Sequence, residues 1–180
     1  KRQKEELKCL KEIPFEDEET RKELGLKAFL HNLSGKKALR TLLYQPTCTI
    51  NGILAGYTGS GSKTVLPRKA MAKLDFRLVP HQTPNDIVRK LKRHLKEHGF
   101  EDIKVIMHGS TAPTKTPITD KFVSTVAKTA EQVYKRKAVV FPTSAGSGPM
   151  HLFRNILRYP VVSVGCGHPE ANGHAPNENL

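Results

Sequence analysis

The chain has 180 residues, a hydrophobic content of 37% and a formal net charge of +13 at pH 7. This size allows one or two small domains, and no apolar run reaches the length of a membrane-spanning helix. The positive charge would suit nucleic acid, but it is spread along the chain: +3 over residues 1–45, +7 over 46–116 and +3 over 117–180. There is no Trp and no aromatic-rich strand that could stack bases, which argues against a nucleic-acid partner.

The first twelve residues, KRQKEELKCLKE, place charges where an export signal needs an apolar stretch, so no export signal is expected. The three cysteines, Cys9, Cys48 and Cys166, are scattered and form no C-x-x-C pair. An odd number without a disulfide framework indicates reduced thiols. We therefore expect a cytoplasmic protein.

Residues 1–45 are expected to form a charged, helical lead-in. An acidic start at 16–19 precedes a short amphipathic helix over 21–30, and the run Gly35-Lys36-Lys37 is expected to break the helical pattern. The apolar positions of the 21–30 helix are Leu24, Leu26 and Leu30.

Two strands are predicted at the start of the segment 46–116. TCTINGIL, residues 47–54, is the first, and Lys69–Val79 is the second because apolar and polar residues alternate along it. The alternation predicts that one face of this strand lies in the core, with Arg77 on the opposite face. The core-facing residues would be Ala70, Ala72, Leu74, Phe76 and Leu78.

A helix should follow, with Thr83 as its N-cap, Pro84 in the first turn, Asp86 near the N-terminus and Gly99 beyond its end. Residues 102–108 then have the pattern of a third strand, with His108 facing away from the core. The segment 46–116 is thus predicted to be a small two-layer α+β unit with an antiparallel sheet.

The run TAPTKTP, residues 111–117, is rich in Pro and Thr and marks the predicted domain boundary. Beyond it, Thr119 should cap another helix. The apolar runs AVVFP, residues 138–142, and YPVVSVG, 159–165, are predicted to be buried strands of an α/β sheet. The predicted units are therefore a lead-in at 1–45, a two-layer domain at 46–116 and part of an α/β domain at 117–180.

The stretch GYTGSGSKTV, residues 56–65, is similar to a phosphate-binding loop but has the wrong spacing. Ser62 separates the last glycine from Lys63, and Pro67 is a poor continuation of a helix. Two interpretations remain: a Gly/Ser connection between two strands, or an anion site in which Thr64 and Lys63 grip a carboxylate.

Two further stretches could carry chemistry. The tail GCGHPEANGHAPNENL is either a solvated loop or a metal-binding loop after a strand end. PTSAGSGPM, residues 142–150, lacks the G-x-S-x-G elbow of a serine nucleophile. Two interpretations remain for it: a tight turn, or a segment that contacts substrate through hydroxyl and backbone N–H groups. The candidate metal ligands of the tail are His168, Glu170, His174 and Glu178.

Taken in order, TCTINGILAGYTGSGSKTVLPRKAMAKLDFRLVP, MHGS, PTSAGSGPM and GHAPNEN resemble the di-zinc metallopeptidases and amidohydrolases. This family includes carnosine dipeptidase, carboxypeptidase G, succinyl-diaminopimelate desuccinylase and aminoacylase. The resemblance covers most of residues 20–180. It implies a smaller ferredoxin-like lid that dimerises, followed by part of a catalytic α/β zinc-peptidase domain.

The resemblance also implies roles for individual residues. Thr64 and Arg77 would bind the substrate carboxylate, the arginine by a bidentate grip. His108 would contact the substrate, Ser147 and Gly146 would hold its terminus, and His174 would be the last metal ligand.

Other parts of the family pattern are missing. There is no early H-x-D, bridging Asp or catalytic Glu-Glu pair, so we expect a fragment whose parent holds two zinc ions, or manganese or cobalt, and hydrolyses an amide bond with metal-activated water. The chain alone is expected to be inactive and to bind no zinc stably. The parent would be a homodimer that cleaves a small peptide or N-acyl amino acid; the alternative is a dimerisation or binding module without catalysis.

Overall fold

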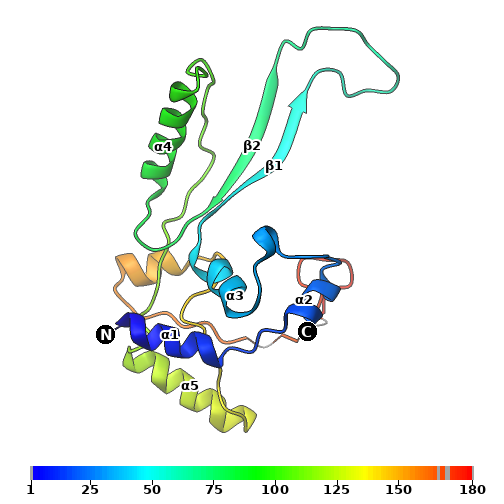
Figure 1. Cartoon of the computed structure of the whole chain (residues 1–180). Coiled ribbons are helices and arrows are strands. Elements are labelled where there is room, and N and C mark those ends of the chain that lie inside the picture. Colours follow the sequence, from blue (N-terminus) through cyan, green and yellow to red (C-terminus); the bar gives the residue numbers. More distant parts are fainter. Residues whose placement is uncertain (1, 166, 169–170, 180) are drawn as a thin grey trace.

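The computed structural model describes residues 2–165, 167–168 and 171–179. Its antiparallel hairpin and one long helix project together from a body that holds the other helices (Figure 1). The architecture is α+β, as the sequence predicts. In chain order the elements are α1 (Arg2–Glu12), α2 (Asp17–Glu23), η1 (Leu30–Asn32), α3 (Gly35–Tyr44), β1 (Thr47–Ala55), β2 (Ala70–Arg77), α4 (Pro84–Glu97), α5 (Lys121–Tyr134) and η2 (Leu152–Ile156).

A small apolar core forms where α1 and the residues after it meet α3. Ile13 and Leu39 are the most buried, at 1% and 2% exposed, with Leu10 and Leu43 beside them. Burying these aliphatic side chains gives the lead-in its main stabilisation, because each removes apolar surface from water. The prediction of a helical lead-in is correct, but its core is supplied by a helix that the sequence analysis missed.

The expected break at Gly35 is wrong, because α3 begins there. The N–H of Gly35 donates to both carboxylate oxygens of Asp17, at 2.7 and 2.9 Å. A carboxylate from a distant helix thus satisfies a backbone donor that α3 itself leaves open. Gly35 also has a φ of 52°, which glycine adopts without strain.

The expected helix over 21–30 is also wrong, because α2 ends at Glu23. Gly25 has a φ of 64° and its N–H donates to the carbonyl of Lys22, while the N–H of Leu26 donates to that of Arg21. This pair of bonds is a Schellman ending, which a glycine in the left-handed region favours. The three leucines expected on an apolar face, Leu24, Leu26 and Leu30, are all exposed.

β1 and β2 pair antiparallel, from Thr47 opposite Arg77 at one end to Ala55 opposite Ala70 at the other. Asn51 is an extra residue in β1, which makes a bulge between Ile50 and Gly52. Residues 56–69 join the strands, so the glycine-rich stretch is a strand connection and leads into no helix.

The expected core face of the second strand is largely open. Ala70, Ala72 and Leu74 are exposed, and only Phe76 and Leu78 of the expected face are half-buried. The predicted third strand at 102–108 is absent too: this segment returns toward the body without a strand ladder (Figure 1). The alternation of apolar and polar residues wrongly predicted a buried face for β2, because a strand face is buried only when another layer covers it.

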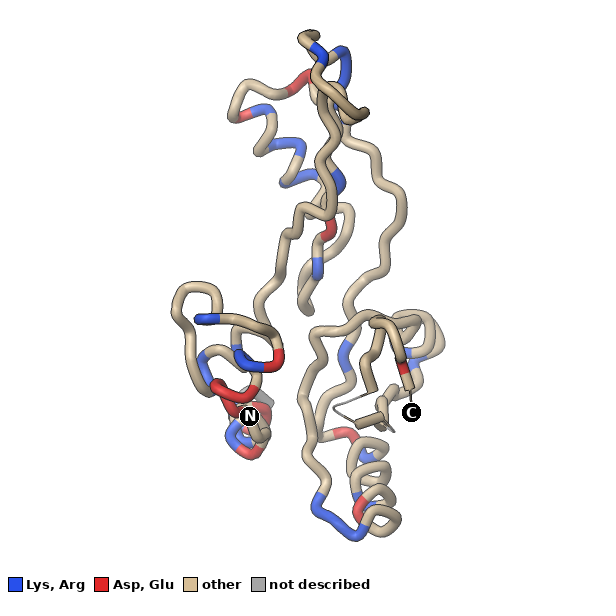
Figure 2. The backbone as a smooth tube through the Cα atoms, turned by 90° about the vertical axis from the view of Figure 1, so that its right-hand side faces the viewer, with Lys and Arg blue, Asp and Glu red and all other residues tan. Residues whose placement is uncertain are grey.

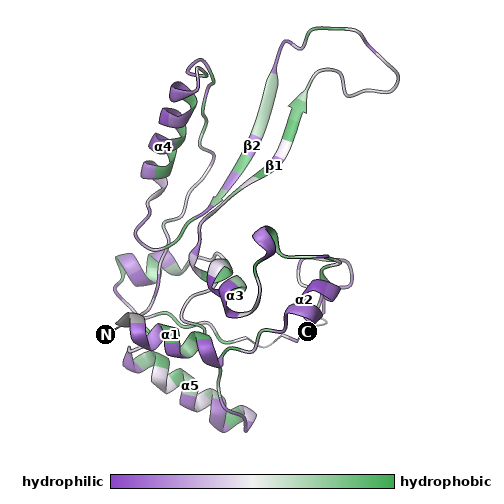
Figure 3. Ribbon diagram, viewed as in Figure 1, coloured by the Kyte–Doolittle hydropathy of each residue, from purple (hydrophilic) through white to green (hydrophobic). Residues whose placement is uncertain are grey.

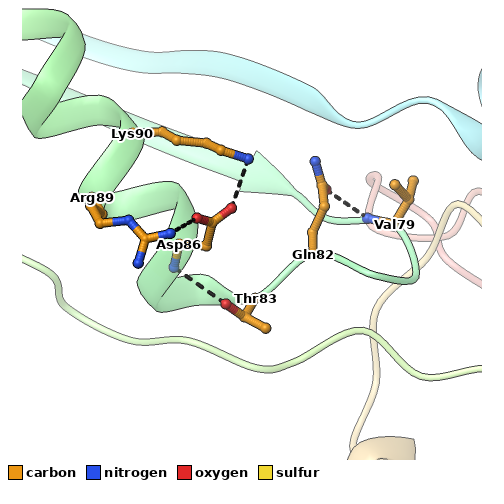
Figure 4. A network of polar contacts seen from close by, with 6 residues as sticks. All are labelled: Val79, Gln82, Thr83, Asp86, Arg89 and Lys90. Carbon is orange, nitrogen blue, oxygen red and sulfur yellow. Dashed lines mark hydrogen bonds and ion pairs between the residues drawn. The ribbon is translucent and has the colours of Figure 1, made fainter.

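α4 agrees closely with the sequence prediction. The N–H of Asp86 donates to Oγ1 of Thr83 at 3.3 Å, and Gly99 follows the helix with a φ of 78°. Asp86 pairs with Lys90 at 2.7 Å and also with Arg89 (Figure 4). The outer face of α4 is hydrophilic and the side toward the hairpin is more hydrophobic (Figure 3).

α5 starts one residue later than expected. Oδ1 of Asp120, not Thr119, accepts the capping bond, from the N–H of Phe122 at 2.9 Å. The runs at 138–142 and 159–165 are not strands. Backbone groups there bind side chains: the N–H of Ala138 donates to Glu131 and that of Val161 to Thr116, at 3.0 and 2.9 Å.

Within the described part of the chain, no helix has the length and apolar character required to cross a membrane.

Candidate functional site

The end of β2 and the 142–150 turn meet through Arg77 and Ser147. Nη1 of Arg77 donates to Oγ of Ser147 at 2.8 Å, although the two residues are 70 positions apart. Nε of Arg77 lies 3.3 Å from Oδ2 of Asp75, and the arginine side chain is 54% exposed. The guanidinium is therefore held in place on two sides while keeping surface for a further partner. A guanidinium in such a position can bind a carboxylate.

The turn that presents Ser147 is held by its own polar and steric contacts. The N–H of Gly146 donates to Oγ of Ser144 at 3.1 Å, and Pro142 at the start of the turn is buried. A Cβ built on Gly148 would lie 2.6 Å from the sulfur of Met150, so a larger residue would displace that side chain. Gly146 and Ser147 themselves are exposed, and can be reached by a ligand.

An open groove of about 460 Å³ lies between the start of α4, residues 110–112 and the segment 149–152. Its hydrogen-bonding side chains come from Thr83, Asn85, Ser110, Thr111 and His151. None of the lining residues is acidic. The groove is therefore suited to a polar, uncharged or anionic group rather than to a cation.

His151 is fixed within this groove by residues that the sequence analysis did not select. Nδ2 of Asn155 lies 2.9 Å from Nδ1 of His151, and Oδ1 of Asn155 accepts from the hydroxyl of Thr114 at 2.9 Å. The available signal was a histidine and an asparagine four positions apart, which is the spacing of neighbours on a helical face. Only the tertiary structure brings Thr114 to them.

The other predicted substrate residues do not join Arg77 within one chain. Thr64 lies in the loop 56–69, at the opposite end of the hairpin from Arg77. Seven strand steps separate the two ends, or about 24 Å. His108 is exposed on the extended segment after α4 and is not among the residues that line the groove.

The C-terminal tail brings its candidate metal ligands only partly together. The N–H of His174 donates to Oε2 of Glu178 at 3.4 Å, and Nε2 of His168 lies 3.0 Å from Oδ1 of Asn179. Glu170 lies outside the described residues. Among the described residues, no three or more His, Cys, Asp or Glu side chains cluster as metal ligands. The described part of the chain therefore does not by itself fit a two-metal centre.

Comparisons with known proteins relate this chain to peptidases. The model of the M20 peptidase dimerisation domain matches residues 9–103. The solved M20 family metallo-carboxypeptidase Sso-CP2 from Sulfolobus solfataricus is 39% identical, with a TM-score of 0.86 over 97% of this chain and 40% of its own.

Curated relatives include the Beta-Ala-His dipeptidase of Rattus norvegicus, 25% identical over 98% of this chain and 37% of its own length. The Cys-Gly metallodipeptidase DUG1 of Saccharomyces cerevisiae is 25% identical over 94% of this chain and 36% of its own length. The chain thus spans little more than a third of the relatives it matches. Together, the family match and the similarity of the fold show that this chain belongs to the M20 metallopeptidase family.

Proposed function

We propose that this chain is part of a peptidase that cleaves an amide bond near a free carboxylate. The observation that carries the proposal is the hydrogen bond between Arg77 and Ser147, which places an exposed guanidinium beside a serine hydroxyl. In the proposal Arg77 binds the carboxylate of a small peptide or N-acyl amino acid. Ser147 and the N–H groups around Gly146 hold the same end of the substrate.

The names of the relatives support a substrate with a free carboxyl end. One is called a carboxypeptidase and others dipeptidases. In both reactions the scissile amide is the last one before a free carboxylate. An arginine held at a fixed distance from the catalytic centre would favour substrates whose carboxylate lies at the matching distance from the scissile amide.

Membership of the family implies a metal cofactor, and we propose that it is a pair of zinc ions. His174 would supply one ligand, and the other ligands and the general base would come from residues that this chain lacks. In the whole enzyme the metal would supply activated water. The 180 residues alone should therefore neither bind zinc stably nor hydrolyse peptides.

The remaining parts of the proposal concern assembly and location. The dimerisation-domain match, over residues 9–103, supports a homodimer. That the dimer forms through residues 46–116, and the boundaries at 45 and 116, stay predictions. A cytoplasmic location also stays a proposal; Cys9 and Cys48 are free thiols, which is compatible with it.

The test compares hydrolysis of a dipeptide and of its C-terminal amide by the whole protein loaded with zinc. The wild type should prefer the free carboxylate. Arg77→Met should remove that preference by lowering kcat/KM for the dipeptide about 10- to 100-fold, since hydrogen bonds to charged groups contribute about 1.5–3 kcal/mol. The amide should be affected little.

Arg68→Met is the matched control, because Arg68 is an exposed arginine in the hairpin loop of the same chain. It should leave both rates unchanged. An equal loss on dipeptide and amide in Arg77→Met would contradict carboxylate recognition. Zinc-dependent turnover by the 180 residues alone would show that the chain carries a complete site.

A further inference from the structure

The groove between the start of α4, residues 110–112 and the segment 149–152 contains a histidine that belongs to a short chain of hydrogen bonds. His151 lines the groove, Asn155 follows it by one helical turn, and Thr114 belongs to the link before α5. Thr114 donates its hydroxyl proton to Oδ1 of Asn155, and Nδ2 of the same amide lies 2.9 Å from Nδ1 of His151.

This arrangement bears on which ring nitrogen of His151 carries the proton. With the Asn155 amide in this orientation its nitrogen donates to Nδ1 of His151, and the neutral ring then carries its proton on Nε2. Within the described residues, the hydrogen bonds of the structure use Nδ1 and leave Nε2 available. The Nε2–H group of His151 can therefore donate a hydrogen bond to a ligand.

The position of Thr114 is itself determined by its neighbours in the link. Lys115 donates to Oε2 of Glu6 in α1 at 2.7 Å, and Oγ1 of Thr116 accepts from the N–H of Val161 at 2.9 Å. Consecutive link residues are therefore tied to α1, to the helical turn at 152–156 and to the segment 159–165. These contacts hold Thr114 within hydrogen-bonding distance of Asn155.

We propose that His151 is a specificity-determining residue, whose Nε2–H donates to an oxygen atom on a side chain of the bound peptide. Asn155 is its positioning residue. The inference rests on the proposed function, which places the carboxyl end of the peptide at Arg77 and Ser147. Ser147 precedes His151 by only four residues. The groove lining supplies further hydrogen-bonding groups and no acidic side chain, which favours amide or carboxylate side chains over lysine or arginine.

The first test measures kcat/KM of the whole zinc-loaded protein for pairs of dipeptides in which one residue is either Asn or Leu. The substitution is made in turn at the first and at the second residue of the dipeptide. Asn and Leu have nearly the same shape, so the ratio of the two kcat/KM values reports the hydrogen bond. The wild type should prefer Asn at one of the two positions, and His151→Phe should lower that preference about tenfold. His94→Phe, an exposed histidine of α4, is the matched control and should keep the wild-type ratio. An unchanged ratio in His151→Phe would overturn the inference.

The second test does not need turnover. NMR of the 180-residue chain with ¹⁵N-labelled histidine should show His151 in the tautomer that carries its proton on Nε2. The Asn155→Leu variant should lose the preference for this tautomer. Adding an Asn-containing dipeptide should shift the Nε2 resonance, whereas its Leu analogue should not. If the whole protein hydrolysed no dipeptide, the proposed function would fail while a selective shift would still support the groove as a binding site. Absence of any selective shift, or a ring protonated on Nδ1, would overturn the inference.

Discussion

Leu39 shows how much of the apolar core depends on a single side chain. It is 2% exposed and packs with Leu10, Ile13 and Leu43, whereas Leu42, three positions along the same helix, is 58% exposed. The helical period alone does not separate them, because residues three positions apart lie on the same side of a helix. The difference comes from packing, since Leu10 and Ile13 cover Leu39 and leave Leu42 open. Few side chains of the described part are as buried, so each contributes a large share of the core.

Leu39→Ala should therefore destabilise the chain by about 2–5 kcal/mol, through lost apolar burial and the cavity left behind. Leu42→Ala, with the same chemistry on the same helix, should change the free energy of unfolding by no more than about 0.5 kcal/mol. Urea unfolding followed by circular dichroism measures both. Similar losses in the two variants would mean that α3 is packed differently.

Arg77 is a second case at the residue scale, because its role depends on a neighbour that no local pattern reveals. Alternation along β2 correctly places it away from Phe76, but its contact with Ser147 joins residues 70 positions apart. The choice of Arg77 and Ser147 as site residues came from the family resemblance. Their proximity in the structure supports that choice, and their roles stay a proposal.

At the scale of elements, α4 is the helix that the sequence specifies most completely. Its cap, its first-turn carboxylate and its terminal glycine all act locally, within four residues. Lys and Arg positions recur along it (Figure 2). Asp86 is central to it, since it lies at the N-terminus and pairs with two of the basic side chains, Arg89 and Lys90.

The hydrogen bond from Lys90, followed by its charge and that of Arg89, lowers the pKa of Asp86 below its usual value. A carboxylate with a lowered pKa in the folded state stabilises that state above the unfolded pKa, about 3.9, and this contribution is lost as pH falls through the folded pKa. Asp86→Asn should thus be less stable than wild type at neutral pH, and the difference should vanish in strong acid.

Urea midpoints measured from neutral pH into strong acid would test this expectation. Asp102→Asn serves as the control, since Asp102 is an exposed carboxylate beyond the end of α4. A difference between wild type and Asp86→Asn that did not depend on pH would show that the ion pairs are not its source.

At the scale of the whole molecule, the lead-in helices and the link are held together by Glu6, Tyr44 and Lys115. Oε2 of Glu6 accepts from the hydroxyl of Tyr44 at 3.1 Å and from Nζ of Lys115 at 2.7 Å, and Lys115 lies over the Tyr44 ring. Burial, followed by the nearby charge of Glu6, raises the pKa of Tyr44 above its usual value. These contacts connect α1 and α3 to the link at residues 111–117. They therefore fix the position from which the chain continues toward α5.

The hairpin raises a second question at this scale, because Thr64 and Arg77 lie at its opposite ends. If both bind the same carboxylate, Thr64 must come from a second copy of the chain, as a symmetric dimer allows. Whole proteins carrying Thr64→Ala or Arg77→Met should each lose most of their activity toward a dipeptide. Refolding them together in equal amounts should restore about a quarter of the wild-type rate, because half the dimers are mixed and each has one intact site.

Mixing without refolding gives the control, since preformed dimers of one variant cannot complement the other. No recovery after refolding, with mixed dimers shown to be present, would mean that Thr64 acts within its own chain or does not contact substrate. Recovery above the expected fraction would point to an effect on folding rather than on the site.

Local interactions explain what the sequence by itself determined. The α+β class, the first hairpin, the connection at 56–69 and the whole of α4 follow from alternation, caps and turn residues, which act over a few positions. The family resemblance implies Arg77 and Ser147 as site residues, although no local pattern indicates a contact between them.

The tertiary structure decided what depends on distant partners. Gly35 begins a helix because Asp17 satisfies its N–H, and the runs at 138–142 and 159–165 stay outside any strand ladder while Glu131 and Thr116 bind their backbone. The open faces of the hairpin, the separation of Thr64 from Arg77 and the groove at His151 are likewise invisible in the sequence. An apolar or polar pattern states which groups need a partner, but only the folded chain determines which partner is within reach.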